Sequence, residues 1–172
     1  GFYQVTPNDY WGSGYDRGHM VPSGDRTSSV SDNAATFLMT NIIPQAPENN
    51  RGPWRELEEY GRELVYQYDR SLHVFAGAYG SQGSVGNRAV AIPSRLWKIM
   101  VVYDRLPDGS LGLGSDTQII AVDMPNIEQV NPDWRQYQTS IQRLEVATGY
   151  TFLENFSADL QTVLKAQTSD VP

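Results

Sequence analysis

An acid, a fixed cation, a glycine and an imidazole stand side by side near the start of the chain, as Asp16, Arg17, Gly18 and His19. A neutral imidazole can take a proton from water near neutral pH, and a guanidinium presents donors that match phosphate oxygens. Gly18 lets the backbone approach a substrate closely. The run therefore suits phosphate chemistry, and a histidine that is only hydrogen-bonded at a strand end is an equally good interpretation of these residues alone.

A second polar group precedes a predicted helix. Asn41 is followed by the run NNR, which ends with Asn50 and Arg51, and the helix then carries Glu58 and Arg62. Amide oxygens are acceptable ligands for a hard cation such as Mg²⁺, which keeps most of its waters and takes few protein ligands. The alternative is ordinary capping sequence, with Glu58 and Arg62 as a standard surface pair at i and i+4.

The two groups together are more specific than either one. The segments YDRGHMVPSGDR, DNAATFLMTNIIPQAPENNRGPW and LEEYGREL closely resemble the DNA/RNA non-specific endonucleases, a family of ββα-metal nucleases with DRGH as a signature. The resemblance is dense from about residue 5 to residue 65 and thinner beyond. It implies a metal-dependent endonuclease that cuts DNA and RNA with little sequence preference and leaves 5′-phosphate products.

The same resemblance implies which residues act. It places the general base on His19 and the single protein ligand of Mg²⁺, for which Mn²⁺ is an acceptable substitute, on Asn50. His19 then deprotonates a water for in-line attack on phosphorus, while the metal stabilises the charge that develops on the phosphate and on the leaving 3′ oxygen. A neutral ligand such as Asn50 is physically sensible because it does not offset the charge of the ion.

Five further residues match positions of the family motif. Arg17 falls on an arginine that supports the active site, and Asn41 falls on an active-site asparagine. Glu58 matches a carboxylate that holds metal-bound water, and Arg62 matches an arginine that neutralises the phosphate. For Asp16, a structural role in fixing the loop is at least as good an interpretation as a catalytic one.

The elements that must position these side chains form an α+β domain, an antiparallel sheet with flanking helices and a ββα-metal motif. Residues 1–14 are expected as strand or loop, and the apolar run 34–43 favours a strand that Pro44 ends. The helical spacing of apolar residues predicts a helix over 53–68. We also expect strands at 73–79, 96–103 and 118–123 and helices at 133–148 and 157–166.

The bulk composition limits the class of protein. With 172 residues and 40% hydrophobic content, one domain over residues 1–167 with a tail at 168–172 is expected. No apolar run approaches the ~20 residues of a membrane-spanning helix, so no membrane partner is expected. The absence of cysteine excludes disulfides and thiolate metal sites. The net charge of -7 argues against binding of nucleic acid through a generally positive surface, although an enzyme needs positive potential only at its cleft.

The resemblance also bears on partners, compartment and chain length. It implies DNA and RNA as substrates, and a protein inhibitor is a further candidate partner. Family members extend well upstream of this motif, so we expect 1–167 to lack an N-terminal part, which without cysteines would be held noncovalently. Members are mostly secreted or periplasmic, with a mitochondrial location as the alternative.

Other residues are better explained by structure. His73 begins a strand pattern without acidic or amide neighbours, and Trp54, Trp97 and Trp134 lie in core-like patterns. The scattered aspartates are expected at the solvated surface, namely Asp104, Asp108, Asp116 and Asp123. The rival functions are a noncatalytic module that binds nucleic acid or a protein on the same fold, and a nuclease of narrower specificity.

Overall fold

The computed structural model describes residues 3–87, 90–108, 110–114 and 116–168. The chain divides into two compact units. The first holds the described residues up to Glu58 with Ala76–Leu96 and Pro125–Asp133, and the second holds Glu59–Phe75, Trp97–Met124 and the described residues from Trp134 onward. The single domain stays a prediction, and residues 169–172 of the predicted tail lie outside the described residues. Within the described ranges, no helix is long and apolar enough to span a membrane.

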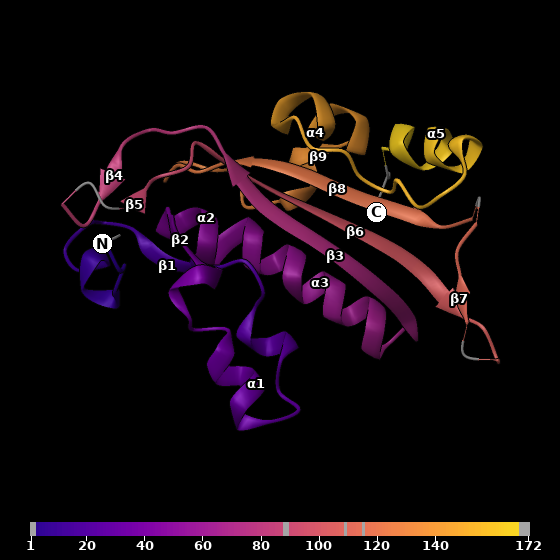
Figure 1. Cartoon of the computed structure of the whole chain (residues 1–172), viewed down its shortest axis with the longest axis horizontal. Coiled ribbons are helices and arrows are strands. Elements are labelled where there is room, and N and C mark those ends of the chain that lie inside the picture. The colour runs from indigo at the N-terminus through magenta and orange to yellow at the C-terminus, as the bar shows by residue number, and fades with distance from the viewer. Residues whose placement is uncertain (1–2, 88–89, 109, 115, 169–172) are drawn as a thin grey trace. The chain divides into compact units, whose positions relative to one another are not determined.

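The first unit is built around a two-stranded hairpin that leads into a helix. β1 (Asp16–His19) pairs antiparallel with β2 (Ile42–Gln45). After β2 come α2 (Pro47–Asn49), a π-helical turn (Asn50–Trp54) and α3 (Arg55–Tyr66). The order of strand, strand and helix is that of the predicted ββα motif (Figure 1).

The stretch between β1 and β2 consists of turns and one short helix. 3-10 turns occupy Ser23–Asp25 and Met39–Asn41. α1 (Val30–Ala35) begins where the hydroxyl oxygen of Ser29 accepts the N–H of Asp32 at 3.0 Å, as expected for a helix N-cap. This local hydrogen bonding, rather than sheet pairing, determines the structure of the segment.

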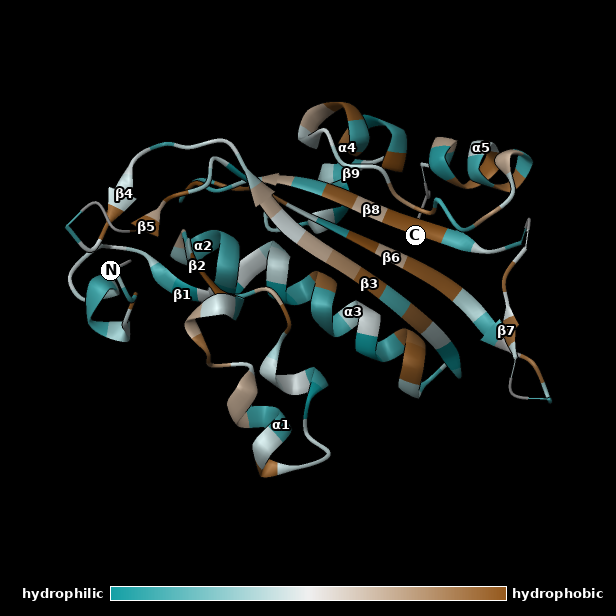
Figure 2. Cartoon of the chain, in the orientation of Figure 1, coloured by the Kyte–Doolittle hydropathy of each residue, from teal (hydrophilic) through white to brown (hydrophobic). Residues whose placement is uncertain are grey.

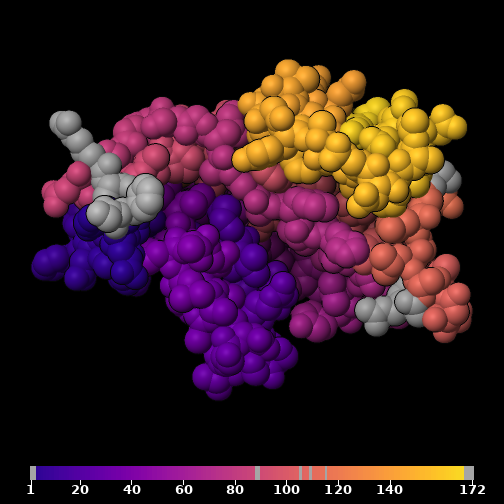
Figure 3. All heavy atoms as spheres, in the orientation of Figure 1, coloured from indigo at the N-terminus to yellow at the C-terminus, as the bar shows by residue number. Residues whose placement is uncertain are grey.

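The strand predicted over residues 34–43 is therefore wrong, except for its last two residues. β2 also continues through Pro44, which is tolerated because an edge strand has a side where no backbone donor is needed. Phe37 and Leu38 are 55% and 59% exposed, so the apolar character of this run does not come from burial in a sheet. In the space-filling view, the atoms around α1 stand out from the rest of the first unit (Figure 3).

A buried amide holds the end of β2 in place. The Asn126 side chain accepts the N–H of Ala46 at 2.8 Å and donates to the carbonyl of Pro44 at 3.0 Å. A buried amide with satisfied donors and acceptors fixes the backbone groups that it joins. The first unit also contains a small hairpin of β4 (Ser84–Val85) and β5 (Val90–Ala91).

The largest sheet has the strand order β3-β6-β8-β9. These strands are β3 (Arg70–Tyr79), β6 (Arg95–Arg105), β8 (Gln118–Pro125) and β9 (Gln138–Thr139), and the short β7 (Leu111–Gly112) pairs with β6. β6 and β8 carry much of the hydrophobic colour in Figure 2. In β6 every residue from Trp97 to Tyr103 is buried, so both faces of this strand must be covered.

Two helices complete the second unit, and one of them is shorter than predicted. α5 (Ala158–Ala166) begins at the predicted cap Ser157, which accepts the N–H of Leu160 at 3.4 Å. The helix predicted over 133–148 is wrong in its first half, where a 3-10 turn and β9 precede α4 (Ile141–Thr148). β9 pairs with β8, so its pairing with the sheet outweighs the helical spacing of these residues.

Opposite faces of β6 contact different elements. Gly61 in α3 lies so close to Met100 that an added Cβ would be 3.3 Å from its sulfur. On the other face, the ring of Trp97 packs against that of Phe152, in the segment between α4 and α5, with 5.3 Å between centroids. Trp97 and Met100 are three residues apart, and side chains in a strand alternate between faces. Within the second unit, α3 therefore covers one face of β6 and the segment after α4 covers the other.

The predicted α+β class and antiparallel sheet are confirmed. The predicted strands appear as β3, β6 and β8, and the helix predicted over 53–68 appears as α3. The three tryptophans predicted for the core are at most 4% exposed. His73 is exposed on β3, with its ring 5.4 Å from that of Tyr103. Of the aspartates predicted for the surface, Asp104, Asp108 and Asp116 are exposed and Asp123 is half-buried.

Candidate active site

His19 is the last residue of β1 and is half-buried. Its Nε2 atom is buried and has no hydrogen-bond partner in the described structure. The Phe37 ring packs against the imidazole in a T-shaped arrangement, with 4.8 Å between centroids and 89° between the ring planes. Burial lowers the pKa of His19 below 6.5, and the positive charge of Arg17 lowers it further. The imidazole is therefore neutral near neutral pH, as a proton acceptor must be.

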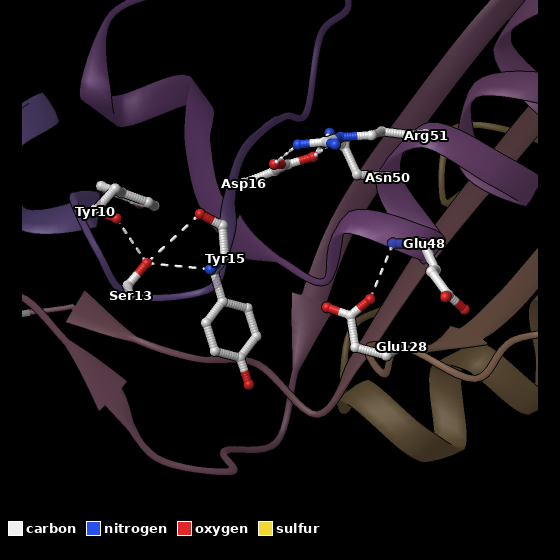
Figure 4. Close-up of polar contacts among 8 residues, drawn as sticks. All are labelled: Tyr10, Ser13, Tyr15, Asp16, Glu48, Asn50, Arg51 and Glu128. Carbon is white, nitrogen blue, oxygen red and sulfur yellow. Dashed lines mark hydrogen bonds and ion pairs between the residues drawn. The ribbon is translucent and has the colours of Figure 1, made fainter.

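Asp16 binds the side chains of Asn50 and Arg51 at the other end of β1 (Figure 4). Asn50 Nδ2 donates to Asp16 Oδ2 at 2.9 Å, and Arg51 donates to both carboxylate oxygens, at 2.8 Å from Nε and 2.6 Å from Nη2. Burial raises the pKa of Asp16, but the hydrogen bonds from Arg51 and Asn50 and the charge of Arg51 outweigh it, so the pKa is lowered. Asp16 is thus an ionised anchor, as its predicted structural role requires.

This anchor orients the amide of Asn50. Because an ionised carboxylate can only accept, Nδ2 of Asn50 must face Asp16, and Oδ1 then points elsewhere. Oδ1 accepts no hydrogen bond among the described residues. A neutral amide oxygen without a partner is a suitable ligand for Mg²⁺, which takes few protein ligands. No group of three or more His, Asp or Glu residues that could hold a metal occurs in the described ranges, and a site with one protein ligand does not require such a group.

Both polar atoms of the Asn41 side chain form hydrogen bonds with backbone groups of neighbouring turns. Its Oδ1 accepts the N–H of Val21, and its Nδ2 donates to the carbonyls of Val21 and Thr36, all at 2.9 Å. The carbonyl of Asn41 also accepts the N–H of Met20, next to His19. The structure therefore gives Asn41 a positioning role, since it fixes the chain that follows the proposed base.

The other predicted residues lie on β1 and α3. Arg17 is exposed, and because side chains in a strand alternate it shares a face of β1 with His19. Glu58 and Arg62 are half-buried and lie one turn apart on α3, and hence on one side of the helix. Arg62 falls in the second unit. The ββα motif of the first unit thus carries all the predicted residues except Arg62.

Two contributors to the site have no signal in the sequence. One is Phe37, which packs against the imidazole in a T-shaped arrangement from the segment before β2. The other is Gln45, which crosses the hairpin diagonally to Gly18. A Cβ on Gly18 would lie 2.1 Å from Gln45 Oε1 and 2.6 Å from Gln45 Cβ. Gly18 was predicted to allow close approach of a substrate, but the space beside it is filled by Gln45.

Gly18→Ala is therefore expected to destabilise the hairpin by about 1–3 kcal/mol, the usual cost of forcing an extra methyl into a packed site. Gln45 cannot move freely, because its Nε2 donates to Asn49 Oδ1 at 2.8 Å. Urea denaturation measures the loss. Gly114→Ala is the matched control, since nothing lies within 4 Å of an added Cβ there. Equal stabilities of the two variants would contradict the steric role of Gly18.

The pH profile should reflect the environment of His19. A lowered pKa favours the neutral imidazole, so activity should persist as the pH falls below 6.5 and be lost only below the pKa of His19. The measurement is kcat/KM against pH. In Arg17→Gln the acid limb should move upward, because one of the two causes of the lowering is removed. An acid limb of the parent protein at or above pH 6.5 would contradict this prediction.

Comparison with known proteins identifies the family. The model of the DNA/RNA non-specific endonucleases matches residues 1–159, so the chain belongs to this family. A nuclease of Nostoc sp. is 49% identical over 97% of this chain and 61% of its own length. Human mitochondrial nuclease EXOG is 31% identical over 96% of this chain and 48% of the length of EXOG itself. The chain therefore spans about half to three fifths of these relatives.

Solved structures show the same fold. The structure of the EndoG/EndoGI complex matches 95% of this chain and 69% of the matched chain, with a TM-score of 0.74 and 24% identity. Human mitochondrial endonuclease G is 26% identical in sequence over 91% of this chain. The structural likeness supports the α+β arrangement described above.

Proposed function

We propose that this chain is a metal-dependent endonuclease that hydrolyses phosphodiester bonds in DNA and RNA. The observation that carries the proposal is the state of His19, a half-buried imidazole at the end of β1 whose lowered pKa keeps it neutral. The same ββα motif holds Asn50 with an oriented amide oxygen. The family and the names of its relatives support nuclease chemistry for a site of this kind.

In this proposal the neutral imidazole of His19 accepts a proton from water as that water attacks phosphorus in line with the leaving 3′ oxygen. The products then carry 5′-phosphates. Glu58 accepts a hydrogen bond from water in the site, and the guanidinium of Arg62 donates to phosphate oxygens. Arg17 supports the active site from β1, where its positive charge lowers the pKa of His19. Asn50 Oδ1 would hold Mg²⁺, or Mn²⁺ in its place, and the ion would supply positive charge next to the phosphate.

Broad specificity follows from the groups available. Arginine and a metal ion contact phosphate oxygens, and these contacts carry no direct sequence information. The net charge of -7 disfavours electrostatic attraction between nucleic acid and the protein surface as a whole, so binding must depend on local positive charge at the site. Such a site accepts either DNA or RNA.

The proposed partners are DNA and RNA, with a protein inhibitor as a further candidate. The inhibitor is suggested by the solved complex in which EndoG is inhibited by EndoGI. For the compartment, the relatives named as mitochondrial support the mitochondrial alternative, whereas the secreted or periplasmic location stays a prediction.

The direct test is incubation of the purified chain with supercoiled plasmid and with single-stranded RNA. Cleavage of both substrates with Mg²⁺ and its loss with EDTA are expected. Cleavage of one substrate alone would favour the nuclease of narrower specificity. If neither substrate is cut with Mg²⁺ or Mn²⁺ while a gel-shift assay shows binding, the noncatalytic module replaces this proposal.

A further inference from the structure

The first unit contains a surface pocket at the end of β1 opposite His19. Its volume is about 650 Å³. The lining combines aromatic, amide and cationic side chains, including those of Asn8, Trp11, Tyr15, Arg17 and Arg51. Small-ligand pockets in proteins have this size and this mixture of apolar surface with a few polar groups.

The most unusual residue of the pocket is Trp11, which is 93% exposed. A tryptophan is usually well buried, because its large apolar surface is costly to leave in water. The three tryptophans predicted for the core follow this rule, with at most 4% exposure. Trp11 instead presents its ring to solvent at the rim of a pocket.

The backbone of the loop that carries Trp11 is braced by local hydrogen bonds on both sides of the tryptophan. A 3-10 turn at Pro7–Tyr10 precedes Trp11 and has a capping box. After Trp11, the Ser13 hydroxyl donates to the carbonyl of Tyr10 at 2.7 Å and accepts the N–H of Tyr15 at 3.1 Å (Figure 4). The backbone that carries the aromatic ring therefore needs little ordering on binding, and loop ordering is a main cost of using a loop as a binding platform.

The charged side chains that line the pocket are two arginines and one aspartate, so one positive charge is not balanced within the pocket. Arg51 and Asp16 form a two-point ion pair, so their charges balance. Arg17 is exposed, and its guanidinium donates no hydrogen bond within the described ranges. A free guanidinium is well suited to a phosphate oxygen pair. An excess positive charge is notable in a chain whose net charge is -7.

We propose that this pocket is a nucleotide subsite for a single-stranded segment of the substrate, with a base stacked on Trp11 and its phosphate on Arg17. Aromatic faces accept any base, so the subsite adds affinity without sequence preference. Asp16 is three residues before His19 in β1, and a strand rises about 3.4 Å per residue. The pocket thus lies on the order of 10 Å along the strand from the base, so it takes a nucleotide near the cleaved one.

This inference rests on the proposed nuclease function for the identity of the ligand, and it restricts the form of the substrate. A base can stack on Trp11 only after it has left the stack of a duplex. Single-stranded DNA or RNA should therefore use the subsite, whereas a fully paired duplex should not.

The test is binding of a fluorescein-labelled oligothymidylate to the full chain carrying His19→Ala, which leaves the strand uncut. Anisotropy should show that adding Trp11→Ala raises Kd roughly 10-fold, the effect of losing one stacked base. Trp11→Phe keeps an aromatic face and should restore most of the affinity. Tyr66→Ala is the matched control, because Tyr66 is also an exposed aromatic, at 78%, and lies outside the pocket. A blunt duplex should bind with the same Kd whether or not Trp11 is present.

Equal Kd values with and without Trp11 would overturn the subsite, as would an equal loss in Tyr66→Ala. Thermal unfolding checks that each variant is folded, and little change is expected because Trp11 is almost wholly exposed. The cleavage assay tests the nuclease proposal separately. A chain that cuts nothing but loses oligonucleotide affinity with Trp11→Ala would retain the subsite and overturn the nuclease alone.

Discussion

His19→Ala is expected to lower kcat by about 10²- to 10⁴-fold, the range contributed by a positioned general base, while the protein stays folded. Nε2 of His19 makes no hydrogen bond in the described structure, so the substitution removes the proposed base and breaks no polar contact at that atom. The edge contact with Phe37 is also lost, which should cost a little stability. Plasmid nicking with saturating Mg²⁺ measures kcat, and thermal unfolding measures the fold.

The chain provides its own control for this experiment. His73 is the only other histidine and lies exposed on β3, so His73→Ala should keep the parent kcat. Added imidazole should restore part of the activity of His19→Ala, because a soluble base can enter the space that the side chain leaves. A parent-like kcat in His19→Ala, or an equal loss in His73→Ala, would overturn the assignment of the base.

The residues of the candidate site could be located in the sequence because they are concentrated in short runs. DRGH and NNR contain Asp16, Asn50 and Arg51, which meet at one end of β1, and His19, which lies at its other end. What the sequence did not show is how each side chain is used. Asn41 gives both its polar atoms to the backbone of Val21 and Thr36, and these partners come from turns that no periodicity reveals.

The contacts around Gly18 and His19 were hidden for a different reason. They depend on the register of the hairpin, in which Gly18 lies opposite Ile43 and Gln45 reaches it diagonally. More than twenty residues separate the two strands along the chain. Register is set by how the intervening turns close, and the sequence pattern of either strand alone does not specify it.

For the fold, long elements were predictable and short ones were not. β6 was found because a run buried on both faces is continuously apolar, and α3 was found because an amphipathic helix repeats every three to four residues. The failures over residues 34–43 and 133–148 fall where helix caps and pairing with a neighbouring strand decide the outcome. Ser29 caps α1, which extends into the segment predicted as a strand, and Ser140 caps α4, which begins in the middle of the segment predicted as one helix.

Asn50→Ala is expected to lower kcat by about 100-fold or more, because even the loss of an outer partner of a metal ligand costs roughly 10- to 100-fold. Mn²⁺ affinity, measured by calorimetry, should fall in parallel. The fold should persist, since Asp16 keeps both hydrogen bonds from Arg51 when the amide of Asn50 is removed. Parent-like kcat and Mn²⁺ affinity in this variant would overturn Asn50 as the ligand.

The Asn50→Asp variant tests whether the metal site requires the oriented amide of Asn50 or only an oxygen ligand at this position. A carboxylate is a usual Mg²⁺ ligand, yet here it would put an acidic oxygen where Nδ2 now lies, 2.9 Å from Asp16 Oδ2. Two carboxylates so close cannot both ionise, so Mn²⁺ affinity and kcat should fall. Adding Asp16→Asn reverses the hydrogen bond between these positions, with the amide at 16 and the carboxylate at 50. Mn²⁺ affinity should then exceed that of Asn50→Asp alone, whereas an undiminished Asn50→Asp would show that Asp16 does not orient the ligand.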